Sequence, residues 1–165
     1  MSTINDKVMN MIARGVLAAV DDGNGVQVLS LSLLAGERKD NVERFMEYGF
    51  TSVPTGEAEA IVIFPGGDRS AGVVVALDER GSRMTGLAAG EVAVYTNEGD
   101  SIVLKRNNEI EVTTRRLVIN AEETIEINAQ QDVTITTPSR VLVRAPLLRV
   151  EGNITASGSI TEGAA

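Results

Sequence analysis

The last third of the chain repeats with a period of eight residues. Two aliphatic positions separated by one residue recur in each repeat, and four consecutive repeats keep strict register between residues 117 and 143. The same pair recurs before and after this run, offset on each side by a single seven-residue step. The repeated aliphatic residues are Ile102, Leu104, Ile110, Val112, Leu117, Ile119, Ile125, Ile127, Val133, Ile135, Val141, Val143, Leu148 and Val150.

This octad repeat predicts one β-strand and one bend per repeat. An apolar residue at every second position gives a strand with one buried face, and the polar residues between the pairs leave room for a corner. Eight residues are too few for one chain to coil around a dry core, so other copies must supply the missing sides. We expect three copies to pair their strand edges and to turn these aliphatic residues toward a common axis.

The dimensions and energetics of such a shaft follow from the repeat. With strands stacked about 4.8 Å apart, the roughly seven repeats of residues 101–155 predict a rod on the order of 35 Å long. Burying one Ile or Val is worth about 1.5–3 kcal/mol, so a dozen or more of them favour assembly despite its entropy cost. We therefore expect the isolated monomeric shaft to be unstable.

The residue types that the chain lacks exclude several function classes. The chain contains no cysteine and no histidine, which excludes a disulfide scaffold, thiolate chemistry and a histidine base. Its net charge is -8, and residues 1–100 hold 15 acidic against 8 basic residues. Because phosphate binding depends on clustered lysine and arginine, we do not expect nucleic acid as a partner. We predict a structural protein with no catalytic residue, cofactor or metal site.

The N-terminal part begins with a helical pattern and continues with strands. Apolar residues in 4–14 recur at nearly helical spacing, so we expect a short helix that ends near Gly15. Two apolar runs, residues 16–20 and 26–34, flank the turn sequence DDGNG and predict a β-hairpin. No apolar run approaches the roughly 20 residues that span a bilayer, and the start lacks a signal-peptide layout, so we expect synthesis in a cytoplasm.

The segment after this hairpin combines a charged stretch with further apolar runs. We interpret residues 37–47 as an irregular excursion that ends on a buried aromatic pair, Tyr48 and Phe50. Further strands are expected at residues 58–64, 72–77 and 90–96. About five short strands with a crossing excursion predict a small β-barrel of the OB kind, and the halves of a sandwich would give a similar pattern.

The predicted fold class is therefore all-β. An OB-like barrel forms the N-terminal part, and a trimeric triple-stranded β-helix forms the C-terminal part. The predicted boundaries are an N-terminal helical segment at 1–14, the barrel at 15–96, the shaft at 97–155 and a terminal segment at 156–165.

Some short patterns resemble catalytic or binding sites, but simpler explanations exist. Glu122, Glu123 and Glu126 could supply the paired carboxylates of a glycan-cleaving site, but acidic residues also solvate a strand corner. The DDGNG turn lacks the alternating acids and distal glutamate of a calcium loop. Residues 65–68 (PGGD) could cradle an anion with backbone amides, but neither Lys-Ser/Thr nor a helix follows. Either contact with anionic lipopolysaccharide or ordinary solubility accounts for the shaft arginines, Arg115, Arg116, Arg140, Arg144 and Arg149.

Six short stretches carry a resemblance to a known family. They are residues 14–17 (RGVL), 36–45 (GERKDNVERF), 48–54 (YGFTSVP), 57–60 (EAEA), 73–80 (VVVALDER) and 90–95 (GEVAVY). Over about residues 10–100, the chain resembles the Mu-type phage baseplate assembly protein V family, and the octad repeat agrees with this independently.

The resemblance implies a homotrimeric central spike in the tail baseplate of a virion. Such a spike lies below the tail tube, contacts the baseplate hub protein and punctures the host outer membrane after assembly in the host cytoplasm. Many relatives end in a His-x-His motif whose three copies hold an iron ion, whereas this chain has no histidine. A blunt tip, a separate tip protein or a shortened chain would each explain this difference.

Two other interpretations belong to different function classes. A receptor- or glycan-binding tail fibre module could use a similar β-helix, but the shaft lacks the aromatic platforms that sugar sites usually contain. An OB-fold that binds single-stranded nucleic acid is disfavoured by the acidic charge and by the small number of aromatic rings.

Overall fold

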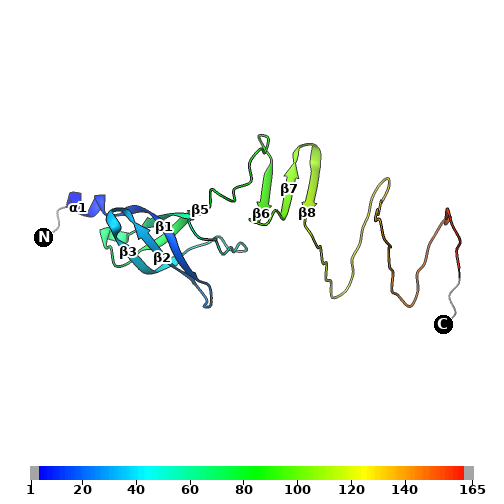
Figure 1. The fold of residues 1–165 in the computed structure, drawn as a ribbon, viewed down its shortest axis with the longest axis horizontal. Coiled ribbons are helices and arrows are strands. Elements are labelled where there is room, and N and C mark those ends of the chain that lie inside the picture. The colour runs from blue at the N-terminus through cyan, green and yellow to red at the C-terminus, as the bar shows by residue number, and fades with distance from the viewer. Residues whose placement is uncertain (1–3, 162–165) are drawn as a thin grey trace. The chain divides into compact units, whose positions relative to one another are not determined.

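The computed structural model describes residues 4–161 and divides the chain into two units, Met1–Val118 and Ile119–Ala165. The first unit contains a short helix, α1 (Ile4–Met9), a closed five-stranded barrel and a separate three-stranded sheet (Figure 1). The chain is therefore nearly all-β, which confirms the predicted fold class at this level. Within residues 4–161, no helical segment has the length and hydropathy of a membrane span.

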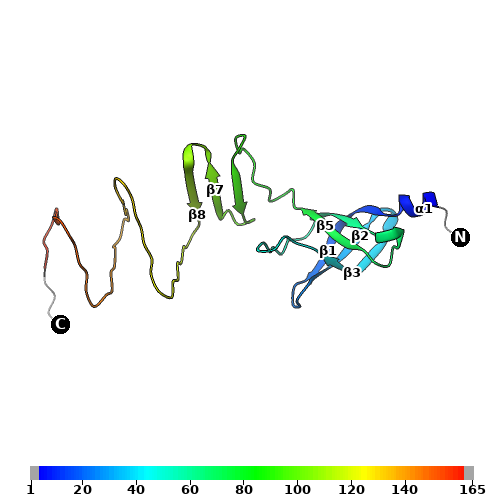
Figure 2. The same cartoon turned by 180° about the vertical axis from the view of Figure 1, so that it is seen from behind.

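The barrel closes in the strand order β1-β2-β3-β5-β4 (Figures 1 and 2). Neighbouring strands are antiparallel except for β3 and β5, which run parallel. Two short 3-10 turns, η1 (Leu34–Gly36) and η2 (Pro65–Gly67), follow β2 and β4. The five strands are β1 (Ile12–Asp21), β2 (Gln27–Leu33), β3 (Arg38–Arg44), β4 (Glu59–Ile63) and β5 (Val73–Asp78).

One set of alternating side chains from these strands fills the barrel. Because successive strand residues point to opposite faces, every second residue of β2 and β4 points inward. Gly15 has no side chain where the strands approach most closely, since a Cβ there would lie 2.6 Å from Leu33 Cδ2. The buried core consists of Leu17, Leu29, Leu31, Leu33, Val42, Ala58, Ala60, Val62, Phe64 and Val74.

The predicted hairpin is confirmed, whereas the predicted helix is too long. β1 and β2 pair antiparallel around the DDGNG turn. However, α1 ends at Met9 and β1 already begins at Ile12, which pairs with Ile63 of β4. Backbone hydrogen bonding to a distant strand therefore overrides the helical spacing of the apolar residues after Met9.

The charged stretch at residues 37–47 contains strand β3, so its interpretation as an irregular excursion is wrong. Val42 is the one buried residue of β3. The strand pairs on one edge with β2 and on the other with β5, and its register against β2 shifts near Asn41, whose φ is +57°. Pairing on both edges makes this segment a strand although its composition gives little sign of one.

The predicted barrel strand at residues 90–96 belongs instead to a second sheet. There β6 (Val92–Tyr95), β7 (Ser101–Lys105) and β8 (Glu109–Thr113) pair antiparallel in sequence order. The 3-10 turn η3 (Arg106–Asn108) joins β7 to β8, and Asn107 and Asn108 have φ of +64° and +60°, as tight hairpin turns require. The fifth strand of the barrel is β3, and not residues 90–96 as we expected.

The aromatic pair expected to be buried is exposed. Tyr48 is 103% exposed and Phe50 is 70% exposed, in the loop between β3 and β4. Among the rings, Phe64 alone belongs to the barrel core, which otherwise consists of aliphatic side chains. The barrel is thus filled without these two rings, and the loop that carries them passes outside it.

The second unit is described over residues 119–161 and contains extended segments without paired strands (Figure 1, yellow to red). The backbone bends at residues 122–123, 130–131, 138–139, 146, 152 and 157–158. From residue 122 to residue 146 the bends follow one another at about the eight-residue spacing of the sequence repeat, and the two later bends depart from it. Every residue of this described segment is exposed.

Candidate assembly surface

One face of the sheet β6-β7-β8 is entirely aliphatic. Val92 pairs with Leu104 and Val94 with Ile102, while on the other side of β7 Ile102 pairs with Val112 and Leu104 with Ile110. Directly opposed residues of an antiparallel pair lie on the same face, so these side chains form one continuous surface. Their exposed fractions range from 45% to 66%. We call this surface the aliphatic face; it comprises Val92, Val94, Ile102, Leu104, Ile110 and Val112.

The opposite face of the same sheet is mainly polar. Lys105 forms ion pairs with Glu111 and, at 3.3 Å from Nζ to Oε1, with Glu109. The Glu111 carboxylate is the main cause of the raised pKa of Lys105. Val103 lies among these residues and is only 9% exposed. The two faces thus differ in chemistry, and the aliphatic face is the one that lacks cover.

The sequence analysis identified four of these residues and missed Val92 and Val94. Both belong to an apolar pair separated by one residue, like every pair of the repeat. Their spacing of ten residues from Ile102 and Leu104 breaks the octad, and we had assigned residues 90–96 to the barrel. Extending the search from a fixed period to the pair itself would have found them.

Beyond the sheet, the repeated aliphatic residues remain exposed in the single chain. Their exposed fractions lie between 50% and 74%. The structure places them in extended segments between regularly spaced bends and does not bring them together within one chain. These residues are Leu117, Ile119, Ile125, Ile127, Val133, Ile135, Val141, Val143, Leu148 and Val150.

The acidic residues considered as a glycan-cleaving pair lie at or next to a bend. Glu122 and Glu123 form the bend itself, Glu126 follows three residues later, and all three are exposed. Their position fits a solvated corner.

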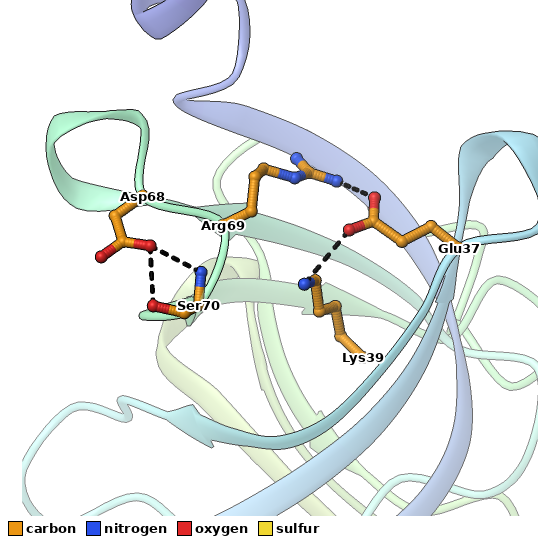
Figure 3. Close-up of polar contacts among 5 residues, drawn as sticks. All are labelled: Glu37, Lys39, Asp68, Arg69 and Ser70. Atoms are coloured by element: carbon orange, nitrogen blue, oxygen red, sulfur yellow. Dashed lines mark hydrogen bonds and ion pairs between the residues drawn. The ribbon is translucent and has the colours of Figure 1, made fainter. Parts of the chain in front are cut away.

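The PGGD loop pairs backbone amides with nearby carbonyl oxygens, and its Asp68 side chain contacts Ser70 (Figure 3). The amides of Gly67 and Asp68 donate to the carbonyl oxygens of Phe64 and Pro65, at 3.0 and 3.2 Å. Asp68 Oδ1 accepts hydrogen bonds from the Ser70 amide at 2.9 Å and from Ser70 Oγ at 2.7 Å. The Gly67 and Asp68 amides are therefore already paired with carbonyl oxygens of the chain, which fits a structural turn.

An ion-pair cluster next to this loop connects two parts of the barrel (Figure 3). Glu37 pairs with Arg69 and, at 3.2 Å, with Lys39, and both interactions lower the pKa of Glu37, Arg69 more strongly. The Arg69 guanidinium also lies 4.1 Å from the centre of the Phe64 ring. The cluster fastens the start of β3 to the loop before β5, which is a structural role.

The DDGNG turn is likewise organised by its own side chains. Asp21 Oδ1 accepts a hydrogen bond from the Gly23 amide at 3.0 Å, and Asp22 Oδ1 accepts one from Gln27 Nε2 at 2.8 Å. Within residues 4–161, no group of three or more acidic side chains is arranged to hold a metal ion. The turn interpretation accounts for these residues.

Comparison with known proteins gives one family model and two relatives, and all three are named after phage Mu gp45. The family model described as "Bacteriophage Mu Gp45, N-terminal" matches residues 14–81, which contain all five barrel strands except the first two residues of β1. The chain is 33% identical to the baseplate puncturing device gp45 of Escherichia phage Mu, over 84% of this chain and 72% of that protein. It is 38% identical to the Mu-like prophage FluMu protein gp45 of Haemophilus influenzae, over 78% of this chain and 69% of that protein. The chain therefore belongs to the Mu-type baseplate spike family that its N-terminal motifs indicated.

Proposed function

We propose that this chain forms the central spike of a phage tail baseplate and punctures the host outer membrane as a homotrimer. One observation carries the proposal: the chain exposes an aliphatic repeat, and over residues 122–146 its backbone bends recur at about the same eight-residue period. The name of the phage Mu relative, a baseplate puncturing device, supports the same role. The function resides in stiffness and assembly, and no catalytic residue takes part.

Three copies would convert the exposed repeat into a core. Each extended segment offers unpaired backbone groups at its edges and aliphatic side chains on one face. Pairing between copies satisfies the backbone groups, and burying each Ile or Val gains about 1.5–3 kcal/mol. The product is a triple-stranded β-helix in which each chain contributes one side of every layer. The sheet β6-β7-β8 would be the first part of this shaft, with its aliphatic face turned inward.

The barrel fits the OB kind that we propose for the N-terminal domain. Five strands close in the order β1-β2-β3-β5-β4, and β1 pairs with both β2 and β4. OB folds are small five-stranded Greek-key barrels. We therefore place the domain order as helical segment, barrel, shaft and terminal segment, with the shaft beginning at β6.

The α1 end of the barrel is the surface that we propose for the baseplate hub protein. A shallow recess of about 440 Å³ lies there between Ile12, Leu34, Glu37 and Arg69. Apolar side chains around it are exposed, Leu34 by 78% and Met9 by 76%. The chain leaves the barrel at the opposite end, after Asp78, so this end is free to face the tail. A separate tip protein at the distal end would account for the missing histidines.

The oligomeric state tests the proposal. Sedimentation equilibrium of the purified chain should give three times the monomer mass of 17.5 kDa at micromolar concentration. A folded monomer under these conditions would exclude the shared shaft.

The alternative function is a receptor- or glycan-binding tail fibre module. All five aromatic residues precede residue 96, so the repeat offers no ring on which a sugar could stack. Binding or cleavage of host lipopolysaccharide glycans by the purified trimer would favour this alternative over mechanical puncture.

A further inference from the structure

The loop between β3 and β4 displays aromatic side chains to solvent. Three of the five rings of the chain lie in residues 45–58, which we call the aromatic loop. Phe45 is 62% exposed, Tyr48 103% and Phe50 70%, and Val53 beside them is 57% exposed. Exposed clusters of aromatic residues mark protein interfaces, because rings provide a large apolar contact area with few rotatable bonds.

The barrel holds this loop firmly at its middle and at its end. The carbonyl oxygen of Ser52 accepts hydrogen bonds from Arg44 Nη1 at 2.9 Å and from Gln27 Nε2 at 3.1 Å. Gln27 is only 3% exposed, so this anchor lies inside the barrel. The Thr55 amide donates to Glu79 Oε2 at 2.9 Å. A loop fastened in this way presents its rings in one arrangement, which lowers the entropy cost of binding.

The aromatic loop lies at the end of the barrel from which the chain departs. β3 ends there, β4 begins there, and β5 ends there at Asp78, whereas α1 lies at the other end (Figure 1). Residues 79–91 then connect β5 to β6. Thirteen residues span at most about 45 Å, so the barrels of copies joined by a common shaft remain at high effective concentration.

The charges at this end are complementary between two segments of the chain. The aromatic loop contains Glu47 and Glu57 and no basic residue. The linker, residues 79–91, contains Arg80 and Arg83 and, at its two ends, Glu79 and Glu91, together with exposed Leu87. Both glutamates accept hydrogen bonds within their own chain, Glu79 from Thr55 and Glu91 from the Ala88 amide. Arg80 pairs with Glu59 of its own barrel at 3.0 Å, and Arg83 is exposed. An arginine that lies beside this loop would be attracted both by the charge of its glutamates and by the faces of its aromatic rings.

We propose that the aromatic loop of one copy packs on the linker of a second copy and so locks neighbouring barrels together. The inference rests on the proposed homotrimer. Within its own chain the linker leaves Tyr48 and Phe50 exposed, so cover must come from elsewhere. Anionic lipid is a poor occupant because the loop itself carries Glu47 and Glu57 and no basic residue.

The chain contains no tryptophan, so a single introduced indole reports on this contact. In the full chain, Phe50→Trp should emit at short wavelength and resist acrylamide quenching while the protein is assembled. Adding Ile127→Asp and Ile135→Asp should separate the copies, shift the emission to longer wavelength and restore quenching. Leu34→Trp is the matched control: it lies at the α1 end, is equally exposed in one chain, and should be quenched in both backgrounds.

The outcomes separate this inference from the proposed function. If the protein sediments as a trimer and the indole at position 50 is fully quenched, the aromatic loop is open to solvent in the trimer. In that case the inference fails and the proposed function stands. If the protein sediments as a monomer, the proposed function fails as well. Arg83→Glu should increase quenching at position 50 without changing the mass, and unchanged protection would overturn the assignment of the linker.

Discussion

The barrel and the distal repeat contain the same kinds of aliphatic residue, but a single chain buries them only in the barrel. Leu29, Leu31 and Val62 are 0% exposed, whereas Ile127 is 74% and Ile135 is 72% exposed. Five strands of one chain enclose an interior because each contributes one side of it. In the distal repeat, each octad of one chain contributes a single extended segment, and a single segment cannot enclose an interior. The difference shows that closure, rather than hydrophobic content, decides which aliphatic residues one chain can bury by itself.

We expect the largest effect from a double substitution in the distal repeat. Ile127→Asp with Ile135→Asp should convert the trimer into a monomer, because each change places a charge in an apolar core that cannot solvate it. The measurement is sedimentation velocity. Thr134→Asp is the matched control, since residue 134 lies between two repeated positions and points to the other face, and it should remain trimeric. Retention of the trimer by the double variant would mean that the opposite face is turned inward.

The next effect belongs to the barrel alone. Leu29→Ala should lower the free energy of unfolding of the barrel by about 2–5 kcal/mol, because it leaves a cavity in a closed core. Hydrogen exchange of β1 and β2 would measure this, and sedimentation should still show a trimer. Leu34→Ala, at a position 78% exposed, should change stability by less than about 0.5 kcal/mol. Loss of the trimer in Leu29→Ala would show that the two regions are not independent.

A smaller effect concerns the buried polar anchor of the barrel. Gln27→Leu should cost about 1–3 kcal/mol, because it removes the partner of Asp22 and one of the partners of Arg44 and the Ser52 carbonyl. Denaturant unfolding followed by circular dichroism would measure the change. Asp22→Asn keeps an acceptor for Gln27 and should be nearly neutral. Equal destabilisation by both variants would shift the explanation to the charge of Asp22.

The smallest effect is a pH dependence of the barrel. The pKa of Glu37 lies below its ordinary value because Arg69 and Lys39 stabilise the carboxylate. Its contribution is therefore fully present above the unfolded pKa and is lost as the pH falls through the lower, folded pKa. Surface ion pairs are worth about 0–1 kcal/mol, so Glu37→Gln should lower the urea midpoint slightly at about pH 7. Wild type and variant should converge once the pH falls below the folded pKa of Glu37, and a constant difference across an acid titration would contradict the ion-pair explanation.

Local pattern predicted much of this molecule. The DDGNG hairpin and the overall β character follow from turn chemistry and from short apolar runs bounded by turn residues. Four of the six residues of the aliphatic face follow from the octad. These features depend on residues that are close in sequence, so the information is present in each segment.

The predictions from sequence that the structure contradicts share a different cause. Residues 38–44 form a strand because β2 and β5 offer hydrogen-bonding edges on both sides, and the charged side chains of β3 simply point outward. The strand at 92–95 pairs with β7 because the next apolar pair is close enough for a hairpin. The position of Tyr48 depends on whether the barrel core has space for another ring. The position of each of these segments depends on how it pairs or packs with other segments, and its own composition does not indicate this.

The sequence by itself determined the eight-residue period, the aliphatic residues that recur with it, and the family. Periodicity acts through the geometry of a single strand, so it can be read without knowing any partner. Only the tertiary structure decided which strands close the barrel, that Val92 and Val94 extend the aliphatic face, and that the aromatic loop lies outside. Those features depend on free-energy differences between alternative pairings of distant segments, and these exist only in the folded chain.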